Sequence, residues 1–264
     1  MIGIFDSGYG GLTVAQKIIE ALPQYDYLYL GDNARTPYGG RSKETITEFS
    51  EEAVEYLWKR GARLIIFACF TASAQALRTL QQKHPDKKIL GVIRPVVEEA
   101  VQVGKKIGVV GTRSTISSHS FTEEIKNLDS TKTVIEQATP LLVPFIEEHW
   151  HEKPEAKMIL KKYLRPLKNT HIDTLILGCT HYPFLQKEFE RIMGRNIKVL
   201  ETGAIVAKSL ASYLERHPEI DQQLTKKSMR EFCTTDSPER FNEFANKFLK
   251  LKTDSVKKIE IKHL

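Results

Sequence analysis

The chain has 264 residues, enough for one large domain or two small ones. Its 41% hydrophobic and 27% charged residues are typical of a globular protein, and no apolar run approaches the roughly 18 residues of a membrane span. The net charge of +6 comes from Lys and Arg scattered among acidic residues, which argues against a nucleic-acid partner. Three cysteines do not make a disulfide framework, so we expect the protein to reside in the reducing cytoplasm.

The first two-thirds of the chain alternates short apolar runs with longer amphipathic segments. Helices are expected at 43–60, 73–82 and 94–103, where apolar residues recur at helical spacing. Strands rich in Ile, Val and Leu that alternate with helices indicate parallel sheets covered on both faces, so the predicted fold class is α/β. The strands are expected at 2–5, 27–30, 63–68, 88–93, 106–111, 174–178 and 197–201.

The last sixty or so residues follow a different pattern. A helix at 204–216 precedes a polar stretch, a possible strand at 230–235 and a helix-like segment at 237–250. The segment 257–264 is a candidate edge strand. The pattern alone does not say which half of the molecule this tail packs against.

Two cysteines occupy matching places in the two halves of the chain. Cys69 follows the strand "RLIIFA" and Cys179 follows the strand "TLILG", and hydroxyl residues and a helical pattern come after each. The two sites are separated by about the length of a small domain. Because open α/β sheets bind ligands at the carboxyl ends of their strands, the two cysteines are expected to face each other across one cleft.

The spacing of the residues argues against several familiar kinds of site. Gly8, Gly10 and Gly11 follow the first strand, but Thr13 stands where a dinucleotide fingerprint needs its last glycine. No phosphate loop and no metal-ligand spacing occur, so neither a cofactor nor a metal is expected. A Cys–His hydrolase that uses Cys179 and His181 stays possible, but it leaves the similarly placed first cysteine unexplained.

Two matched thiols suit the inversion of a stereocentre without a cofactor. One group must remove a proton from one face of a carbon while the other delivers a proton to the opposite face. Thiols have an ordinary pKa of about 8.5, close enough to neutrality for the surroundings to set one as thiolate and one as thiol. Asp6, directly after the first strand, and His181, two residues past Cys179, are natural assistants in proton transfer.

At this point the sequence resembles the glutamate racemases, over residues 2 to about 205. The segments that carry the resemblance are "FDSGYGGLTV" at 5–14, "GDNARTPYG" at 31–39, "ACFTASA" at 68–74, "GVVGTRSTI" at 108–116, "PLLVPFIEE" at 140–148 and "LGCTHYP" at 177–183. The resemblance implies a cofactor-independent enzyme that makes D-glutamate for bacterial peptidoglycan. It also implies a homodimer and two pseudo-symmetric α/β domains that face each other across a central cleft. The first domain would comprise 1–95 with the returning segment 207–264, and the second 96–206.

The resemblance also implies roles for individual residues. Cys69 and Cys179 match the two acid/base positions, and Asp6, Glu147 and His181 match the assisting positions. His181 favours glutamate over aspartate, because related aspartate racemases resemble "GCTE" where this chain has "GCTH". The positions that contact the substrate are matched by Asp6, Ser7, Tyr38, Gly39, Phe70, Thr71, Thr180 and His181.

Phe70 departs from the family pattern, which has an asparagine after the first cysteine. A missing hydrogen bond to a charged substrate costs roughly 1.5–3 kcal/mol, so we expect a working enzyme with reduced turnover. The alternatives are a pocket reshaped for another amino acid, or a binding protein that has lost most racemisation.

Plainer explanations exist for several of these residues. Asp6 and Ser7 can be turn and cap residues, Tyr38 with Gly39 an ordinary turn, and His181 a helix cap. Glu148 offers a carboxylate equal to that of Glu147. Cys233 lacks the context of the other two cysteines and is expected to be a small hydrophobe on a strand.

Overall fold

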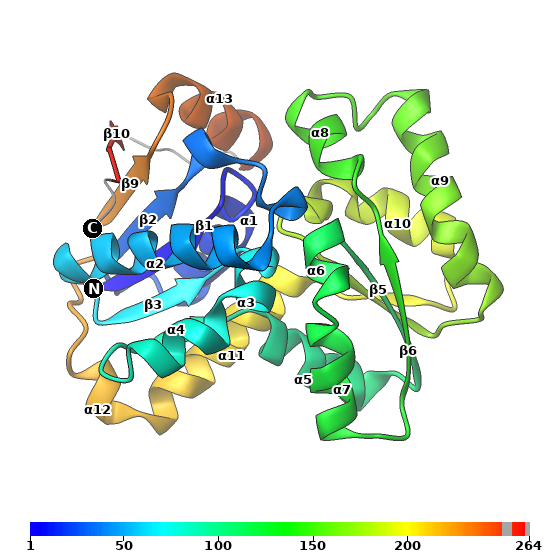
Figure 1. Cartoon of the computed structure of the whole chain (residues 1–264), viewed down its shortest axis with the longest axis horizontal. Helices are drawn as coiled ribbons and strands as arrows, with labels where there is room; N and C mark the ends of the chain where they lie inside the picture. Colours follow the sequence, from blue (N-terminus) through cyan, green and yellow to red (C-terminus); the bar gives the residue numbers. More distant parts are fainter. Residues whose placement is uncertain (250–254, 262–264) are drawn as a thin grey trace.

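The computed structural model describes residues 1–249 and 255–261, whose strands form two parallel sheets in two lobes that lie side by side (Figure 1). The first lobe holds six strands in the order β10-β9-β2-β1-β3-β4, and the second holds four in the order β6-β5-β7-β8. Every strand pair is parallel, which confirms the predicted α/β class. The strands are β1 Ile2–Asp6, β2 Tyr27–Gly31, β3 Leu64–Phe67, β4 Ile89–Gly91, β5 Lys106–Gly111, β6 Thr133–Ala138, β7 Thr174–Gly178, β8 Lys198–Val199, β9 Arg230–Thr234 and β10 Val256–Lys258.

Helices and short 3₁₀ turns connect these strands. The helices are α1 Leu12–Ala21, α2 Lys43–Lys59, α3 Phe70–Gln75, α4 Leu77–Lys83, α5 Ile93–Val103, α6 Arg113–Ser117, α7 Ser120–Leu128, α8 Leu142–Glu147, α9 Pro154–Asn169, α10 Gln186–Met193, α11 Thr202–Arg216, α12 Pro218–Asp221 and α13 Pro238–Leu249. The 3₁₀ turns are η1 Asn33–Arg35, η2 Tyr38–Gly40 and η3 Tyr182–Leu185. None of the helices in the described ranges is long and apolar enough to cross a membrane.

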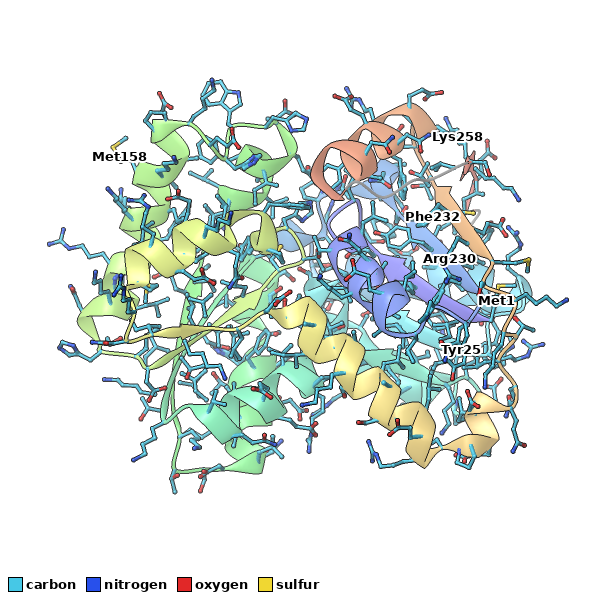
Figure 2. The ribbon with its side chains drawn as sticks, turned by 180° about the vertical axis from the view of Figure 1, so that it is seen from behind. Met1, Tyr25, Met158, Arg230, Phe232 and Lys258 are labelled. Carbon is cyan, nitrogen blue, oxygen red and sulfur yellow. The ribbon has the colours of Figure 1, made fainter. Side chains whose placement is uncertain are left out.

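The first lobe is built around β1, whose five residues are all buried between β2 and β3. Alternate side chains of β1 enter different clusters: Ile2 and Ile4 pack with α1 and α11, and Phe5 packs with α2. Figure 2 shows α11 crossing the back of the molecule, where it packs along α1. Because both faces of the sheet are covered at its centre, β1, β2 and β3 are buried throughout, as the sequence pattern predicted.

The tail completes the six-stranded sheet. β9 pairs with β2 and β10 pairs with β9, so the candidate strand at 230–235 is confirmed and lies on the outer side of the first lobe (Figure 2). The candidate edge strand at 257–264 begins earlier and is shorter, as β10 at 256–258, and residues 262–264 lie outside the described part. The predicted helix at 237–250 is α13, apart from residue 250, which also lies outside it.

Other predicted elements were also wrong in their limits. The strand expected at 197–201 is only β8, Lys198–Val199. The strand at 88–93 ends at Gly91, because Pro95 in the first turn favours a helix that begins at Ile93. The helix at 73–82 is broken at Ala76 into α3 and α4. The predicted domain limits stay a prediction, and both fall inside helices, since 95–96 lies in α5 and 206–207 in α11.

Candidate active site

The two matched cysteines meet at one cavity of about 260 Å³. Cys69 follows β3 of the first lobe and Cys179 follows β7 of the second, and both line this cavity. Of the other predicted site residues, the lining includes Ser7, Tyr38, Gly39, Phe70, Thr71, Glu147, Thr180 and His181. The carboxyl ends of the strands in both sheets therefore face a single space, as expected for parallel α/β sheets.

Cys69 is held in a neutral surrounding. It caps α3, because its Sγ accepts a hydrogen bond from the backbone N–H of Ala72 (3.4 Å), and its thiol donates to Ser7 Oγ (3.4 Å). Burial, together with the nearby Asp6 carboxylate, raises the pKa of the Cys69 thiol to about 12. This cysteine is therefore a protonated thiol at neutral pH.

Cys179 lies beside a charged pair. His181 Nδ1 is 3.8 Å from Cys179 Sγ, and His181 Nε2 is 2.9 Å from Glu147 Oε1. Burial alone would lower the pKa of His181, but its contacts with Cys179 and Glu147 outweigh burial and raise this pKa well above its usual range. A positively charged imidazole ring therefore lies next to the sulfur of Cys179.

Asp6 lies behind the cavity rather than on its wall. Its carboxylate is fully buried and accepts hydrogen bonds from the Gly8 N–H (2.9 Å) and the Thr180 hydroxyl (3.5 Å). Burial raises the pKa of Asp6, and the charge of His181 partly opposes this rise. Asp6 is not among the residues that line the cavity, and its contact with the substrate stays a prediction.

The glycine-rich turn after β1 packs against the second lobe. A Cβ on Gly10 would lie 2.5 Å from His181 Nδ1 and from Thr180 Oγ1, so only glycine fits there. Thr13 adds a hydrogen bond from its hydroxyl to the carbonyl of Thr180 (2.9 Å). Gly10 was missed as a site residue by the sequence reasoning, although it lies within the quoted segment "FDSGYGGLTV".

A cluster of threonine hydroxyls joins the Cys69 loop to the second lobe. Thr71 Oγ1 lies 3.0 Å from Thr112 Oγ1 and 3.0 Å from Thr115 Oγ1. Gly39 packs against Thr112, since a Cβ at Gly39 would lie 2.6 Å from Thr112 Cβ. Thr112 was missed by the sequence reasoning, although it lies within the quoted segment "GVVGTRSTI".

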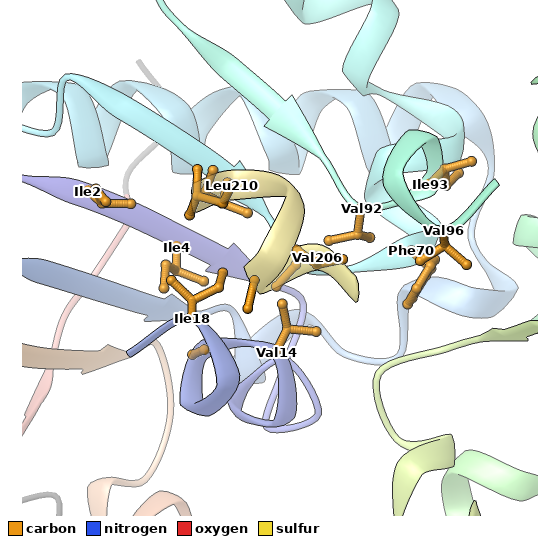
Figure 3. Packing of buried hydrophobic residues seen from close by; sticks show 14 of the residues in the cluster. Ile2, Ile4, Val14, Ile18, Phe70, Val92, Ile93, Val96, Val206 and Leu210 are labelled. Carbon is orange, nitrogen blue, oxygen red and sulfur yellow. The ribbon is translucent and has the colours of Figure 1, made fainter. Parts of the chain in front are cut away.

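Tyr38 and Phe70 direct their rings away from open solvent. The Tyr38 ring is buried, and its hydroxyl donates to Asp32 Oδ2 (2.5 Å), which leaves the rest of the residue to line the cavity. The Phe70 ring is 1% exposed and lies near Val92 and Val96 of the core (Figure 3). Phe70 thus gives the cavity wall no polar side-chain group.

Arg113 is a third residue that the sequence reasoning missed. It is exposed, lines the cavity directly after Thr112, and makes no ion pair with the described residues. The other cavity-lining residues in the described part include neither Lys nor Arg. Glu147 balances the charge of His181, so Arg113 supplies the positive charge that attracts an anion to the cavity.

The arrangement can transfer protons from two sides of a bound molecule. One wall presents a neutral thiol and the other presents a sulfur beside an imidazolium, each at the end of a rigid strand. Among the described residues, no group of three or more His, Cys, Asp or Glu side chains is arranged to hold a metal ion.

Comparisons with known proteins agree with the fold and the site described above. The family model described as Asp/Glu/Hydantoin racemase matches residues 2–210. The glutamate racemase of Geobacter metallireducens is 38% identical over 98% of this chain and 96% of its own. The crystal structure of a glutamate racemase from Bacillus anthracis superposes with a TM-score of 0.91 at 35% identity, covering 98% of this chain and 97% of the other. That of the Francisella tularensis glutamate racemase in complex with D-glutamate gives 0.90 at 30% identity, with the same coverage. The chain belongs to the Asp/Glu/Hydantoin racemase family, among its glutamate racemases.

Proposed function

We propose that the protein interconverts L- and D-glutamate without a cofactor and thereby supplies D-glutamate for peptidoglycan. The observation that carries the proposal is the convergence of Cys69 and Cys179, from matching strand ends of two lobes, on one cavity. The relatives named above are glutamate racemases, and one was crystallised with D-glutamate.

In the proposed mechanism the two thiols act on opposite faces of the α-carbon. One sulfur, as thiolate, removes the α-proton, and the other, as thiol, delivers its proton to the opposite face of the planar carbanion. The bond lost at the α-carbon is replaced by a new C–H bond, and the two sulfurs exchange their protonation states. The neutral Cys69 thiol matches the proton-donating starting state, and His181 lies beside the sulfur of Cys179 at 3.8 Å.

The remaining cavity residues suit a substrate with two carboxylates. The hydroxyls of Ser7, Thr71 and Thr180 can bind its carboxylates and ammonium group, with Arg113 adding positive charge at the wall. His181 and Glu147 assist proton transfer at Cys179, and Asp6 acts on both loops from behind the wall.

Phe70 lowers turnover in this proposal, because its apolar ring offers no hydrogen bond to the substrate. We further propose a cytoplasmic location, which the three buried free cysteines support, and a homodimer, which rests on the family resemblance. Light scattering coupled to size exclusion tests the assembly.

One observation favours a second candidate. Cys179, His181 and Glu147 form a chain of contacts that resembles a Cys–His–carboxylate hydrolase. Such a hydrolase forms a covalent intermediate on Cys179 and keeps its activity when Cys69 is replaced, whereas the racemase needs both thiols.

The test of the proposed function is racemisation of each glutamate enantiomer, followed by circular dichroism, with proton NMR of α-proton exchange in deuterated water. The expected result is conversion from both sides to the same racemic mixture. A folded protein that binds glutamate but exchanges no α-proton refutes the proposal. Phe70→Asn, measured beside Phe70→Leu, tests the missing hydrogen bond, because both variants lack the aromatic ring: an Asn variant faster than the Leu variant confirms that prediction, and an equal or slower one contradicts it.

A further inference from the structure

Helix α3, which begins directly after Cys69, is fixed to the opposite lobe along its length. Gln75 Nε2 donates to the carbonyl of Ser114 (2.7 Å), and the hydroxyl of Ser120 donates to the carbonyl of Ala74 (3.0 Å). These bonds hold the far end of the helix. The end that carries the thiol is held by different contacts.

An aromatic pair lies at the thiol end of α3. The ring of Phe70 stacks on that of Phe121, with centroids 5.9 Å apart and ring planes 24° apart. Phe121 belongs to α7 of the second lobe, and both rings are buried. The pair therefore spans the junction between the two lobes.

The far side of the Phe121 ring reaches the other thiol loop. A Cβ on Gly178 would lie 3.0 Å from Phe121 Cε2, so this ring packs directly on the glycine that precedes Cys179. One continuous path of covalent neighbours and ring contacts thus runs from Cys69 through Phe70, Phe121 and Gly178 to Cys179. It is short and contains only buried groups.

We propose that Phe70 and Phe121 are positioning residues, whose stacked rings set the spacing between the two thiol loops across the cavity. This inference rests on the proposed racemase function. Stacked rings in a packed interior have few rotamers and little freedom to shift, so they transmit a fixed distance. Proton transfer at two faces of one carbon needs both sulfurs in place together, and a misplacement of about 1 Å costs on the order of a hundredfold in rate.

Phe121→Leu tests the inference away from the substrate, because Phe121 does not line the cavity. We expect kcat to fall about tenfold in both directions while KM stays within about twofold. The matched control is Ile125→Ala, one turn further along α7 and equally buried, which is expected to lower the melting temperature without changing kcat. An unchanged kcat in Phe121→Leu, whatever its melting temperature, overturns the proposal. Phe121→Met gives the same readout if the leucine variant does not fold.

A double-mutant cycle separates the stack from a direct contact of Phe70 with the substrate. If the rings act as a pair, Phe70→Leu, Phe121→Leu and the double variant lose kcat to the same extent. Additive losses, or a raised KM with unchanged kcat in Phe70→Leu, overturn the proposal. Phe70→Asn is unsuitable here, because it adds an amide and removes the stack at once.

The unaltered protein, measured in the same series, distinguishes failure of the proposed racemase function from failure of the positioning role. If it fails to exchange the α-proton of glutamate, the proposed function is refuted. If it is active and the ring variants keep its kcat, only the positioning role is refuted.

Discussion

The two thiol loops share a plan but differ in charge. Each continues a buried parallel strand with a cysteine and a threonine-containing turn, and each lines the same cavity. Cys69 faces a serine hydroxyl and a helix N–H, with a carboxylate behind it, whereas Cys179 faces a protonated histidine. The symmetry of the fold thus brings two equal groups together and gives them unequal neighbours. A proton relay with two ends needs this inequality before the substrate arrives.

The loops also differ in how the opposite lobe holds them. The Cys69 loop is held by the hydroxyls around Thr71 and by a ring stack. The Cys179 loop is held by a glycine that admits the His181 ring and by the bond from Thr13 to Thr180. The attachment of the Cys69 loop thus depends on hydroxyl contacts and stacked rings, whereas that of the Cys179 loop depends on the absence of a Cβ at Gly10.

The largest effect is expected when either of the two thiols is removed. Cys69→Ala and Cys179→Ala should each lower racemisation by about 10³-fold or more, because either loss removes one of two obligatory proton carriers. Circular dichroism with each enantiomer measures it. Cys233→Ala is the control, since this buried thiol lies on β9 away from the cavity. Activity that survives Cys69→Ala would favour the hydrolase instead.

The next largest effect concerns the Cys179 loop, where His181 and Glu147 are charged. Glu147→Gln removes the negative charge that helps to keep the pKa of His181 high, so this pKa should fall. The alkaline decline of kcat should then move to lower pH, with a loss of about tenfold near neutrality. The pH–rate profiles of the unaltered protein and of Glu147→Gln measure this shift. Glu148→Gln, one residue further along, serves as control, and an equal shift there would contradict the assignment.

Two glycine substitutions compare the attachments of the loops. Gly10→Ala places a Cβ 2.5 Å from His181 and Thr180, and Gly39→Ala places one 2.6 Å from Thr112. We expect several-fold losses of kcat from both, larger for Gly10→Ala, because the buried His181 ring and the Thr180 side chain must shift there. Gly40→Ala is the control, since its Cβ would meet nothing within 4 Å. Equal kcat in all three variants would show that these close approaches do not position the loops.

The smallest effect is on stability at alkaline pH. Because the pKa of Cys69 is raised to about 12 in the folded protein, above its ordinary value, its protonation stabilises the fold below about pH 9. That contribution is lost as the pH rises towards 12. The melting temperature of the unaltered protein should therefore fall more steeply between pH 8.5 and 10.5 than that of Cys69→Ala, by roughly a few degrees. Parallel slopes, measured under reducing conditions, would contradict the neutral surrounding of Cys69.

The sequence predicted those features that repeat locally. Buried strands such as β1 and β7 stand out as runs of Ile, Val and Leu, and the two cysteines stand out because each follows such a run. By contrast β6, "TVIEQA", was missed, because an edge strand with half-exposed polar residues lacks this signal. The break at Ala76 was missed because the apolar spacing continues across it.

Contacts between distant residues could not be predicted. The sequence shows Phe70 beside Cys69, but it does not show that the ring stacks on Phe121 rather than facing the substrate. Gly10 looked like part of a failed fingerprint until His181 was found against it. Arg113 carried no signal, since its place on the cavity wall follows from the junction of the two lobes.

The pairing of β9 with β2 has a consequence for the order of synthesis. The strands of the second sheet are contiguous in the chain, from β5 to β8, so that sheet can assemble as soon as it leaves the ribosome. The first sheet begins with β1 and β2, but the outer side of β2 stays an open edge until residues 230–234 emerge. The first lobe therefore begins to be synthesised before the second but completes its sheet after it. A ribosome stalled before β9 would leave β2 as an unpaired edge strand, which can pair with other chains.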